Sequence, residues 1–426
     1  MSQITLNPLE SSTLIQTTQR VNSLDAKTIS IVKSTVPTLQ EHGEALTRHF
    51  YGRMFTQNPE VKPFFNQSNQ SSGGQPRALS TAICAYAANI DNIEALRSAV
   101  ELIAHKHASL QVRADQYPII GSNLLSSIKE VMGEGATDEV ISAWGEAYDF
   151  LADILIKRES QIYDQNAKIP GGWKGFRTFQ IAKKEKESQN ITSFYLKPKD
   201  EKELPIFQAG QYITIRVKTP DGSTTMRNYS LSDKPGTGYF RISVKKEESH
   251  IQGVPQGYVS NLLHTELDVG SSLEVGPPCG EFFLNLDENS KKPLVLISGG
   301  VGITPLFSML LNALEKMPQR EIIFIECCKN KDVQPFKEYL ESLKKTYPKL
   351  TVFYRYSDVQ TPEKNENEIG RIDQKMMKSI IANQDSDYYF CGPQPFMSSI
   401  YNTLMEWNVP KDQVHFEFFG PLGALK

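Results

Sequence analysis

The chain has 426 residues, which predicts roughly three domains at about 150 residues each. It carries 46 Lys and Arg against 49 Asp and Glu, and the net charge of −3 gives no electrostatic reason to bind nucleic acid or an anionic membrane. No apolar run approaches the roughly 20 residues that a membrane span needs, so we expect no transmembrane segment. Five cysteines, an odd number, do not suit a disulfide framework, and we expect reduced thiols and a cytoplasmic protein.

Residues 1–22 are rich in Ser, Thr and Gln and show little periodicity, which predicts a mobile tail. The segment holds one arginine, Arg20, and is therefore a poor match to a mitochondrial targeting peptide. A simple extension is the favoured interpretation, and mitochondrial targeting is the alternative.

Residues 23–163 show helical spacing of their apolar side chains and no strand signal. Ser23 is a candidate N-cap for the first helix, and Pro37 should bend or end that helix. The polar, Gly-containing stretch 66–75 is typical of a loop. We therefore expect one all-α domain over 23–163.

The pattern changes after this domain. A Pro-Gly-Gly sequence predicts a linker over 164–174. Residues 175–285 alternate polar and apolar side chains between turn residues, which predicts a small antiparallel β-barrel or sandwich. Residues 292–426 alternate short apolar runs with helical stretches, which is typical of a doubly wound α/β domain with a parallel sheet.

A glycine-rich turn follows the first apolar run of this last domain and opens a helix. Glycines let the backbone approach a pyrophosphate, and a helix N-terminus offers free N–H groups to it. A plain loop is the alternative, because the usual third glycine is replaced by proline. A second turn after a later strand either lines the same sheet edge or is mere punctuation. The candidate nicotinamide-binding residues are Gly300, Val301, Gly302, Ile303, Thr304, Pro305, Cys391, Gly392 and Pro393.

The barrel region holds two short motifs, each of which is common when it occurs alone. They are Arg227, Asn228, Tyr229 and Ser230 near a strand end, and Gly257, Val259 and Ser260 at a helix start. In this order, and followed by the two turns above, they resemble the FAD-binding elements of the ferredoxin reductase-like family. The resemblance implies that Tyr229 packs on the isoalloxazine, that Ser230 faces its reactive edge and that Arg227 pairs with the pyrophosphate.

Two further segments fit the same family pattern. Tyr212 lies on a strand that resembles the family's flavin-contacting strand. Near the C-terminus, Phe419 resembles the aromatic residue that shields the flavin until nicotinamide displaces it. A simple apolar C-terminal strand is the alternative for that segment. The candidate FAD residues here are Tyr212, Phe418, Phe419, Gly420 and Pro421.

One histidine in the helical region shares an apolar helix face. His107 follows Ile103 by four residues, whereas His105 lies about 200° away around the helix. A histidine on an apolar face is more often a satisfied core residue than a metal ligand, so this position alone decides nothing.

A glutamate in the same domain favours the interpretation of His107 as a metal ligand. Glu159 follows Leu155 by four residues and therefore lies on the apolar stripe of its own helix. Glutamate is almost never buried without a partner. It could accept the N–H of His107 while the other imidazole nitrogen binds iron, and Tyr117 could join this network.

Four other residues are candidates for the opposite side of a haem. Tyr51 could handle oxygen, although a half-buried core tyrosine is the alternative. Gln75 precedes Leu79 by four residues, so both can face one pocket, and Phe65 lies in a bend.

Taken together, the helical domain resembles the globin domain of the flavohemoglobins. The residues that carry the resemblance are His49, Phe50, Tyr51, Phe65, Gln75, Lys106, His107, Tyr117, Trp144, Gly145, Arg158 and Glu159. It implies that His107 is the proximal ligand of haem b, with Tyr117 and Glu159 as its relay partners. It implies a distal pocket of Tyr51, Gln75 and Leu79, with Phe65 against the haem. Lys106 matches a family lysine between haem and flavin. The longer tail and Ile303, where some members have Gln, depart from the family pattern.

The family resemblance implies nitric oxide dioxygenation, and we separately expect the chain to be a monomer. NAD(P)H reduces FAD, FAD reduces the haem one electron at a time, and NO and O2 become nitrate. Two alternatives are a haem-based sensor or store of O2 or NO, and a flavin reductase of ferric iron or quinones with an incidental globin. Lys329 and Lys331 could meet a 2′-phosphate but are more often surface lysines, so the choice between NADH and NADPH stays open.

Overall fold

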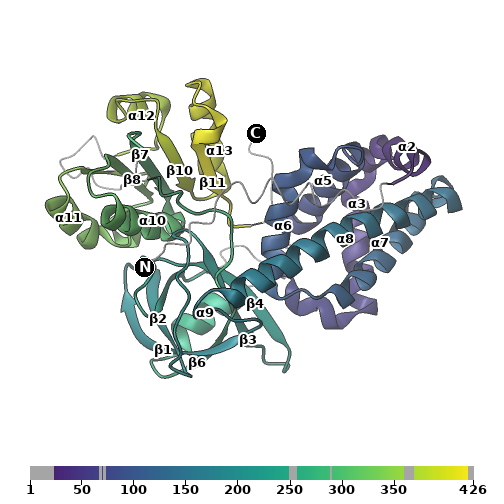
Figure 1. The fold of residues 1–426 in the computed structure, drawn as a ribbon, viewed down its shortest axis with the longest axis horizontal. Coiled ribbons are helices and arrows are strands. Elements are labelled where there is room, and N and C mark those ends of the chain that lie inside the picture. The colour runs from purple at the N-terminus through teal and green to yellow at the C-terminus, as the bar shows by residue number, and fades with distance from the viewer. Residues whose placement is uncertain are drawn as a thin grey trace.

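The computed structural model describes residues 24–66, 70, 73–248, 257–287, 290–358 and 369–420. The expected tail 1–22, the candidate cap Ser23 and Pro421 lie outside these residues. The chain forms a helical domain, an antiparallel sheet and a parallel α/β domain in that order, so the predicted fold class is confirmed (Figure 1). Among the described residues, no helix has both the length and the apolarity to cross a membrane.

The helical domain begins with two helices separated by a single residue. The first is capped by Asp25, whose carboxylate accepts a hydrogen bond from the Thr28 N–H, and it ends at Ser34. Pro37 lies in the first turn of the second helix, where its missing N–H costs nothing, so the predicted break is confirmed. The helices of this domain are α2 (Ala26–Ser34), α3 (Val36–Gln57), the 3₁₀ helix η1 (Pro59–Phe64), α5 (Gly74–Ala88), α6 (Arg97–Leu110), α7 (Tyr117–Met132) and α8 (Asp138–Lys168).

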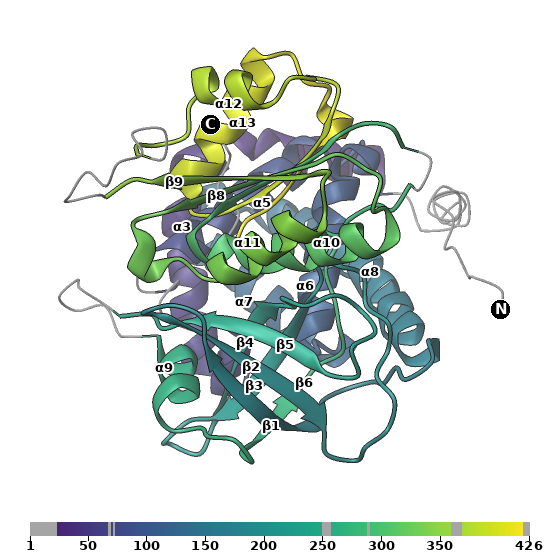
Figure 2. The same ribbon diagram turned by 90° about the vertical axis from the view of Figure 1, so that its left-hand side faces the viewer.

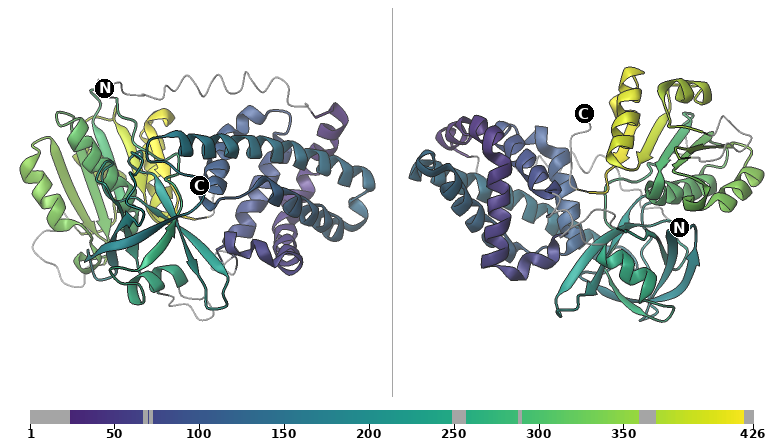
Figure 3. Two further views of the ribbon diagram at one scale, coloured as in Figure 1. Left: turned by 60° about the horizontal axis from the view of Figure 1, so that its bottom comes forward. Right: turned by 180° about the vertical axis from the view of Figure 1, so that it is seen from behind.

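Helix α8 joins this domain to the rest of the molecule. It continues to Lys168, so the first part of the expected linker 164–174 is helical. Its C-terminal end reaches the β-domain, where the Asn166 amide lies 3.6 Å from the Cys279 sulfur (Figure 3). The globin-like helices and the barrel therefore make direct contact.

The second domain is a six-stranded antiparallel sheet in the order β4-β3-β6-β1-β2-β5. A bridge between Leu231 and Ile242 connects the end of β4 to β5, so the sheet closes into a barrel. The inward side chains of alternate positions form its core. Its elements are β1 (Arg177–Lys186), β2 (Ile191–Pro198), β3 (Tyr212–Lys218), β4 (Thr224–Ser230), β5 (Phe240–Lys245), α9 (Tyr258–Thr265) and β6 (Ser272–Val275).

The third domain is a five-stranded sheet in the order β11-β10-β7-β8-β9, with every neighbouring pair parallel. Helices α10 and α11 cover one face, and α12 and α13 cover the other (Figure 2). The elements are β7 (Leu294–Gly299), the 3₁₀ helix η5 (Gly300–Gly302), α10 (Ile303–Lys316), β8 (Ile322–Cys328), α11 (Lys337–Thr346), β9 (Leu350–Tyr356), α12 (Gln374–Ile380), β10 (Asp387–Cys391), α13 (Gln394–Glu406) and β11 (Val414–Glu417). All five cysteines of the chain are free thiols.

Candidate functional site

Three polar side chains meet inside the helical domain. His107 on α6 places Nδ1 2.8 Å from Glu159 Oε1 and 3.0 Å from the Tyr117 hydroxyl. The hydroxyl donates to the same Glu159 oxygen at 2.5 Å. Glu159 is only 2% exposed, so these two partners replace the water that would bond to an exposed carboxyl group. The structure thus brings together the histidine, tyrosine and glutamate predicted from the sequence.

The second and third tyrosines of this region hold the neighbouring backbone. The Tyr148 hydroxyl donates to the carbonyl oxygen of Tyr117 at 2.6 Å, and the Tyr163 hydroxyl donates to that of Val112 at 2.6 Å. Burial raises the pKa of both phenols, so they remain protonated donors. The helix ends around His107 are therefore fixed by buried hydrogen bonds.

Tyr51 lies on α3 in the larger of the two apolar clusters of this domain, together with Leu79 and Phe65. Its ring is 5.6 Å from the Phe65 ring, edge to face, and its hydroxyl is hydrogen-bonded to the Gln75 side chain. Burial is the main reason why the pKa of Tyr51 is raised well above its usual value. The hydroxyl therefore keeps its proton and can donate a hydrogen bond at any physiological pH.

Sequence reasoning missed Gln70 in this pocket. Its side chain, like that of Gln75, lies within interaction distance of the Tyr51 hydroxyl, and its Nε2 is buried. The only sequence signal was its place in the polar stretch 66–75, which we interpreted as a plain loop.

The flavin motif of the barrel lies on β4, next to the globin-like domain. Arg227 donates to the carbonyl oxygen of Met226, to the Thr225 hydroxyl and to Asn66 Oδ1, all of which are neutral acceptors. Burial lowers the pKa of its guanidinium. No carboxylate within the described ranges forms an ion pair with it, so this half-buried cation fits an anionic ligand.

The other predicted flavin residues surround this strand. Tyr229 is half-buried and packs against the barrel core, Ser230 is 7% exposed, and Ser260 at the start of α9 donates to the Gly257 carbonyl oxygen at 2.9 Å. The Asn228 amide donates to the hydroxyl of Ser109, on α6 of the helical domain, at 3.1 Å. Val259 is buried in the core, whereas Phe418, Phe419 and Gly420 follow β11, with Phe419 exposed.

The nicotinamide turn is held by a close backbone contact. A Cβ on Gly302 would lie 2.2 Å from the Cys391 carbonyl oxygen, so only glycine fits there. Helix α10 starts at Ile303, and no side chain caps its first N–H groups. Strands β7 and β10 are neighbours, which places Gly392 and Pro393 beside the turn. The structure therefore joins the two predicted nicotinamide segments at one sheet edge.

The three domains meet at Lys106, Tyr212 and Glu417. The Lys106 ammonium lies 5.5 Å from the Tyr212 ring centre. Burial lowers the pKa of Lys106 and raises that of Glu417 to about 7, while each charge favours the charged form of the other. One Glu417 oxygen is buried with no hydrogen-bond partner within the described residues. The sequence predicted Lys106 and Tyr212, but nothing in it indicated that Glu417 would be buried beside them.

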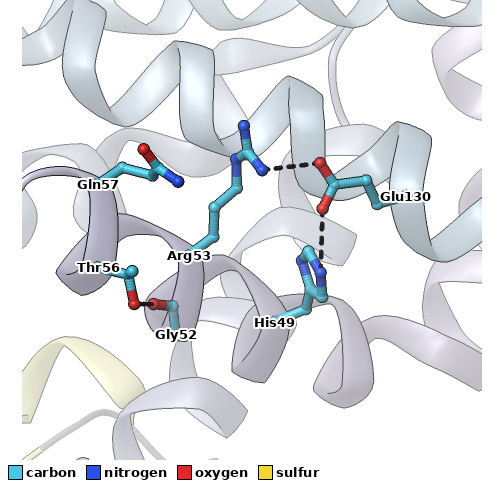
Figure 4. A pocket seen from close by; sticks show the side chains of 6 residues that line it. All are labelled: His49, Gly52, Arg53, Thr56, Gln57 and Glu130. Atoms are coloured by element: carbon cyan, nitrogen blue, oxygen red, sulfur yellow. Dashed lines mark hydrogen bonds and ion pairs between the residues drawn. The ribbon is translucent and has the colours of Figure 1, made fainter.

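Two other polar clusters contain none of the residues predicted to bind haem, FAD or nicotinamide. An open surface pocket between α3 and α7 is lined by His49, Gly52, Arg53, Thr56, Gln57 and Glu130 (Figure 4). His49 and Arg53 both pair with Glu130, so the charges satisfy one another. A second group, Glu101, His105 and Glu281, has ligand atoms within 4.8 Å, but Arg158 already binds both Glu101 oxygens.

The comparisons with known proteins agree with this architecture. Three family models match: globin over residues 48–155, oxidoreductase FAD-binding domain over 178–284, and oxidoreductase NAD-binding domain over 296–402. The flavohemoprotein of Halalkalibacterium halodurans is 46% identical over 408 residues, covering 95% of this chain and 98% of the relative. The chain belongs to the flavohemoprotein family. The resemblance predicted from the sequence is thereby confirmed.

Two solved structures support the same assignment of domains. The crystal structure of the Malassezia yamatoensis flavohemoglobin with bound FAD and haem has a TM-score of 0.79 and 27% identity, and it covers 93% of this chain and 100% of that one. The FAD/NAD-binding domain of the nitric oxide dioxygenase from Vibrio cholerae has a TM-score of 0.50 and 31% identity, and covers 57% of this chain and 99% of that one. This flavohemoprotein thus has haem, FAD and NAD domains in one chain.

The residues present fit these groups. The His107 side chain is 33% exposed although it lies in the domain interior, and its Nε2 has no hydrogen-bond partner within the described ranges. The apolar core of the helical domain divides into two clusters, which share Leu96, Tyr148 and Leu151. An imidazole fixed through Nδ1, with Nε2 free, is the donor arrangement that haem iron takes.

Proposed function

We propose that this flavohemoprotein is an NAD(P)H-dependent nitric oxide dioxygenase that converts NO and O2 to nitrate. The observation that carries the proposal is the buried network of His107, Tyr117 and Glu159 on the same chain as a complete reductase module. A haem that only stores a ligand needs no fused electron supply. The nitric oxide dioxygenase of Vibrio cholerae has a similar FAD/NAD domain, which supports this reaction over other oxidoreductase chemistry.

When bound, FAD takes hydride as an electron pair and passes single electrons to the haem, where O2 and NO react. The chain's own residues prepare the iron side. Glu159 accepts the Nδ1–H of His107 and so makes the imidazole more basic, which favours electron donation to a metal at Nε2. Tyr117 holds the carboxylate in place through its short hydrogen bond.

The proposed distal residues act by hydrogen bonding. Tyr51 is buried and protonated, so its O–H can stabilise negative charge that develops on dioxygen during the reaction. Gln75 orients that hydroxyl, and Leu79 and Phe65 keep the surroundings apolar. A hydrogen-bond donor that is already oriented in a dry pocket stabilises developing negative charge more than the same donor in water, because it needs no reorganisation.

The proposed reductase residues bind and orient the two nucleotides. Arg227 would meet the FAD pyrophosphate, and Tyr229 and Ser230 would contact the flavin ring. The turn from Gly300 to Pro305 would receive the nicotinamide pyrophosphate on the free N–H groups of α10. Phe419, which is exposed at the end of the described chain, would cover the flavin until nicotinamide replaces it.

Electron counting gives a strict test. Oxidation of NO to nitrate by O2 needs one added electron, and each NADH supplies two, so two nitrate ions should form per NADH oxidised. We expect purified protein in aerated buffer to consume NADH only slowly until NO is added, and then to form nitrate in that 2:1 ratio. No stimulation by NO would favour a sensor or store. A protein without a Soret band that reduces ferric iron or quinones would favour the plain flavin reductase.

A further inference from the structure

Two neighbouring residues of the flavin motif are bonded to the globin domain rather than to the barrel alone. The Arg227 guanidinium donates through Nη2 to Asn66 Oδ1 at 2.8 Å, and the Asn228 amide donates to the Ser109 hydroxyl at 3.1 Å. The partners are separated by 161 and 119 positions in the chain. The strand that carries the flavin motif is therefore partly positioned by another domain.

Both globin residues lie next to residues of the haem site. Asn66 directly follows Phe65, whose ring packs against Tyr51. Ser109 lies two positions after His107 on α6, is fully buried and donates to the Lys106 carbonyl oxygen at 2.8 Å. One contact therefore starts on the distal side of the haem pocket and the other on the proximal helix.

The chemistry of the first contact is specific. Asn66 offers Arg227 a neutral acceptor, as do the Thr225 hydroxyl and the Met226 carbonyl. Neutral acceptors hold the guanidinium plane in one orientation without cancelling its charge. A carboxylate at the same place would bind the arginine more tightly but would compete with a phosphate for it. The contact orients the cation and leaves its charge for a ligand.

We propose that the globin domain completes the FAD site: Asn66 and Ser109 are positioning residues that fix Arg227 and Asn228 for the flavin nucleotide. The inference rests on the proposed role of Arg227 at the FAD pyrophosphate. It makes FAD affinity a property of the docked pair of domains, and it links flavin occupancy to both sides of the haem pocket.

The test is the affinity of the full-length, haem-loaded chain for FAD, measured by equilibrium ultrafiltration after the flavin has been released. Asn66→Leu keeps the side-chain size but removes the acceptor, and the Kd for FAD should rise about tenfold, as expected for loss of one hydrogen bond to a charged group. Asn66→Asp should raise the Kd further than Asn66→Leu, because the new carboxylate competes with the pyrophosphate. If the contact only docks the two domains, Asn66→Asp should instead raise the Kd less than Asn66→Leu does, because a carboxylate at this position binds Arg227 more strongly than the amide.

Two controls separate positioning from general docking. Glu281→Gln breaks another contact between the same domains, the 3.0 Å pair with His105, without touching β4, and should change the Kd less than twofold. Arg227→Gln should itself weaken FAD binding, and adding Asn66→Leu to it should have no further effect, because the two residues act through one interaction.

A second variant keeps the inference testable if Asn66→Leu fails to fold, which the Soret band and thermal unfolding would reveal. Ser109→Ala removes the neutral acceptor of the Asn228 amide, together with the hydroxyl's own bond to the Lys106 carbonyl oxygen, and should raise the Kd roughly threefold. An unchanged Kd in both Asn66→Leu and Ser109→Ala overturns the inference, as does tighter binding by Asn66→Asp. These measurements use neither NO nor NADH, so the FAD site and the proposed reaction can fail independently.

Discussion

The proposed haem pocket and the proposed nicotinamide turn show two different ways to build a binding site. In the helical domain, the site depends on side chains from separate helices: His107 and Glu159 are 52 positions apart and meet at 2.8 Å. In the α/β domain, the turn Gly300–Gly302 and the start of α10 present backbone N–H groups within a few consecutive residues. A site made of backbone depends on local sequence, whereas a site made of side chains depends on how distant helices pack.

Two buried carboxylates extend this comparison. Glu159 in the helical domain is 2% exposed and is bonded to a tyrosine hydroxyl and an imidazole. Glu326 in the α/β domain is 1% exposed and is bonded to the Gln334 amide and the Cys328 thiol. Burial raises the pKa of Glu326 to about 8, because its donors are neutral and desolvation is the largest contribution. With nearly equal burial, Glu159 is thus bonded to the proposed haem ligand, whereas Glu326 is bonded to neutral side chains of its own domain.

The largest effect should come from the side-chain site. Tyr51→Phe removes the buried hydroxyl and should lower NO-dependent nitrate formation roughly 100-fold, the usual cost of losing one preoriented donor. NADH-dependent reduction of cytochrome c should be unchanged, because the flavin module is untouched. Tyr86→Phe is the matched control, since its buried hydroxyl donates only to the Ala147 carbonyl oxygen. Equal NO turnover in Tyr51→Phe and the parent would refute the role of Tyr51.

The contrast between carboxylates predicts a pH effect on stability. The folded state of Glu326 retains its proton up to about pH 8, whereas the unfolded state loses it near 4.5, so the free energy of unfolding falls as pH rises between these values. Glu326→Gln should abolish this fall and should be more stable than the parent at pH 9 by on the order of 3 kcal/mol. Urea unfolding at pH 5 and pH 9 measures the free energy of unfolding of both proteins. Glu321→Gln, at an exposed position, is the control. Parallel pH profiles for parent and Glu326→Gln would contradict the prediction.

The backbone site is best tested by a pair of glycines. Gly302→Ala places a Cβ 2.2 Å from a backbone oxygen, which cannot move aside as the end of a flexible side chain can. The turn is therefore displaced, and the free energy of unfolding should fall by about 2 kcal/mol. Gly300→Ala meets no atom within 4 Å but must keep a φ of +54°, and should cost about 1 kcal/mol. Stopped-flow reduction of FAD by NADH should be slowed more by Gly302→Ala, with the haem spectrum unchanged in both. Equal rates in the two variants would show that the close contact does not shape the turn.

The smallest effect concerns the tyrosines around His107. Tyr117→Phe leaves Glu159 with the imidazole as its remaining donor and should cost about 1.5 kcal/mol of stability. It should also lower NO turnover about tenfold, because Tyr117 no longer holds the Glu159 carboxylate that accepts the His107 Nδ1–H in one position. Tyr163→Phe removes a comparable buried hydrogen bond to a neutral carbonyl and should leave turnover unchanged. If both variants lose turnover equally, the network acts through packing alone.

Much of the architecture could be predicted because each domain has its own local period. Helical spacing, alternating strands and the βα alternation are properties of neighbouring residues, and Pro37 marked a helix break for the same reason. The boundary after the helices was harder, since nothing near 163 stops α8 before Lys168. His107 and Glu159 could be paired because each interrupts an apolar stripe, which is costly unless the two meet.

The sequence by itself determined the three domains, the glycine-rich turn before α10 and the pairing of His107 with the buried Glu159, because these follow from local pattern and from the cost of burying polar groups. Only the tertiary structure decided that Gln70 faces Tyr51, that Glu417 lies beside Lys106 and that Asn66 and Ser109 hold the flavin strand. These residues occupy loops, strand ends and domain contacts, where no periodicity constrains a side chain. Their partners are set by how the domains pack, which depends on the whole chain.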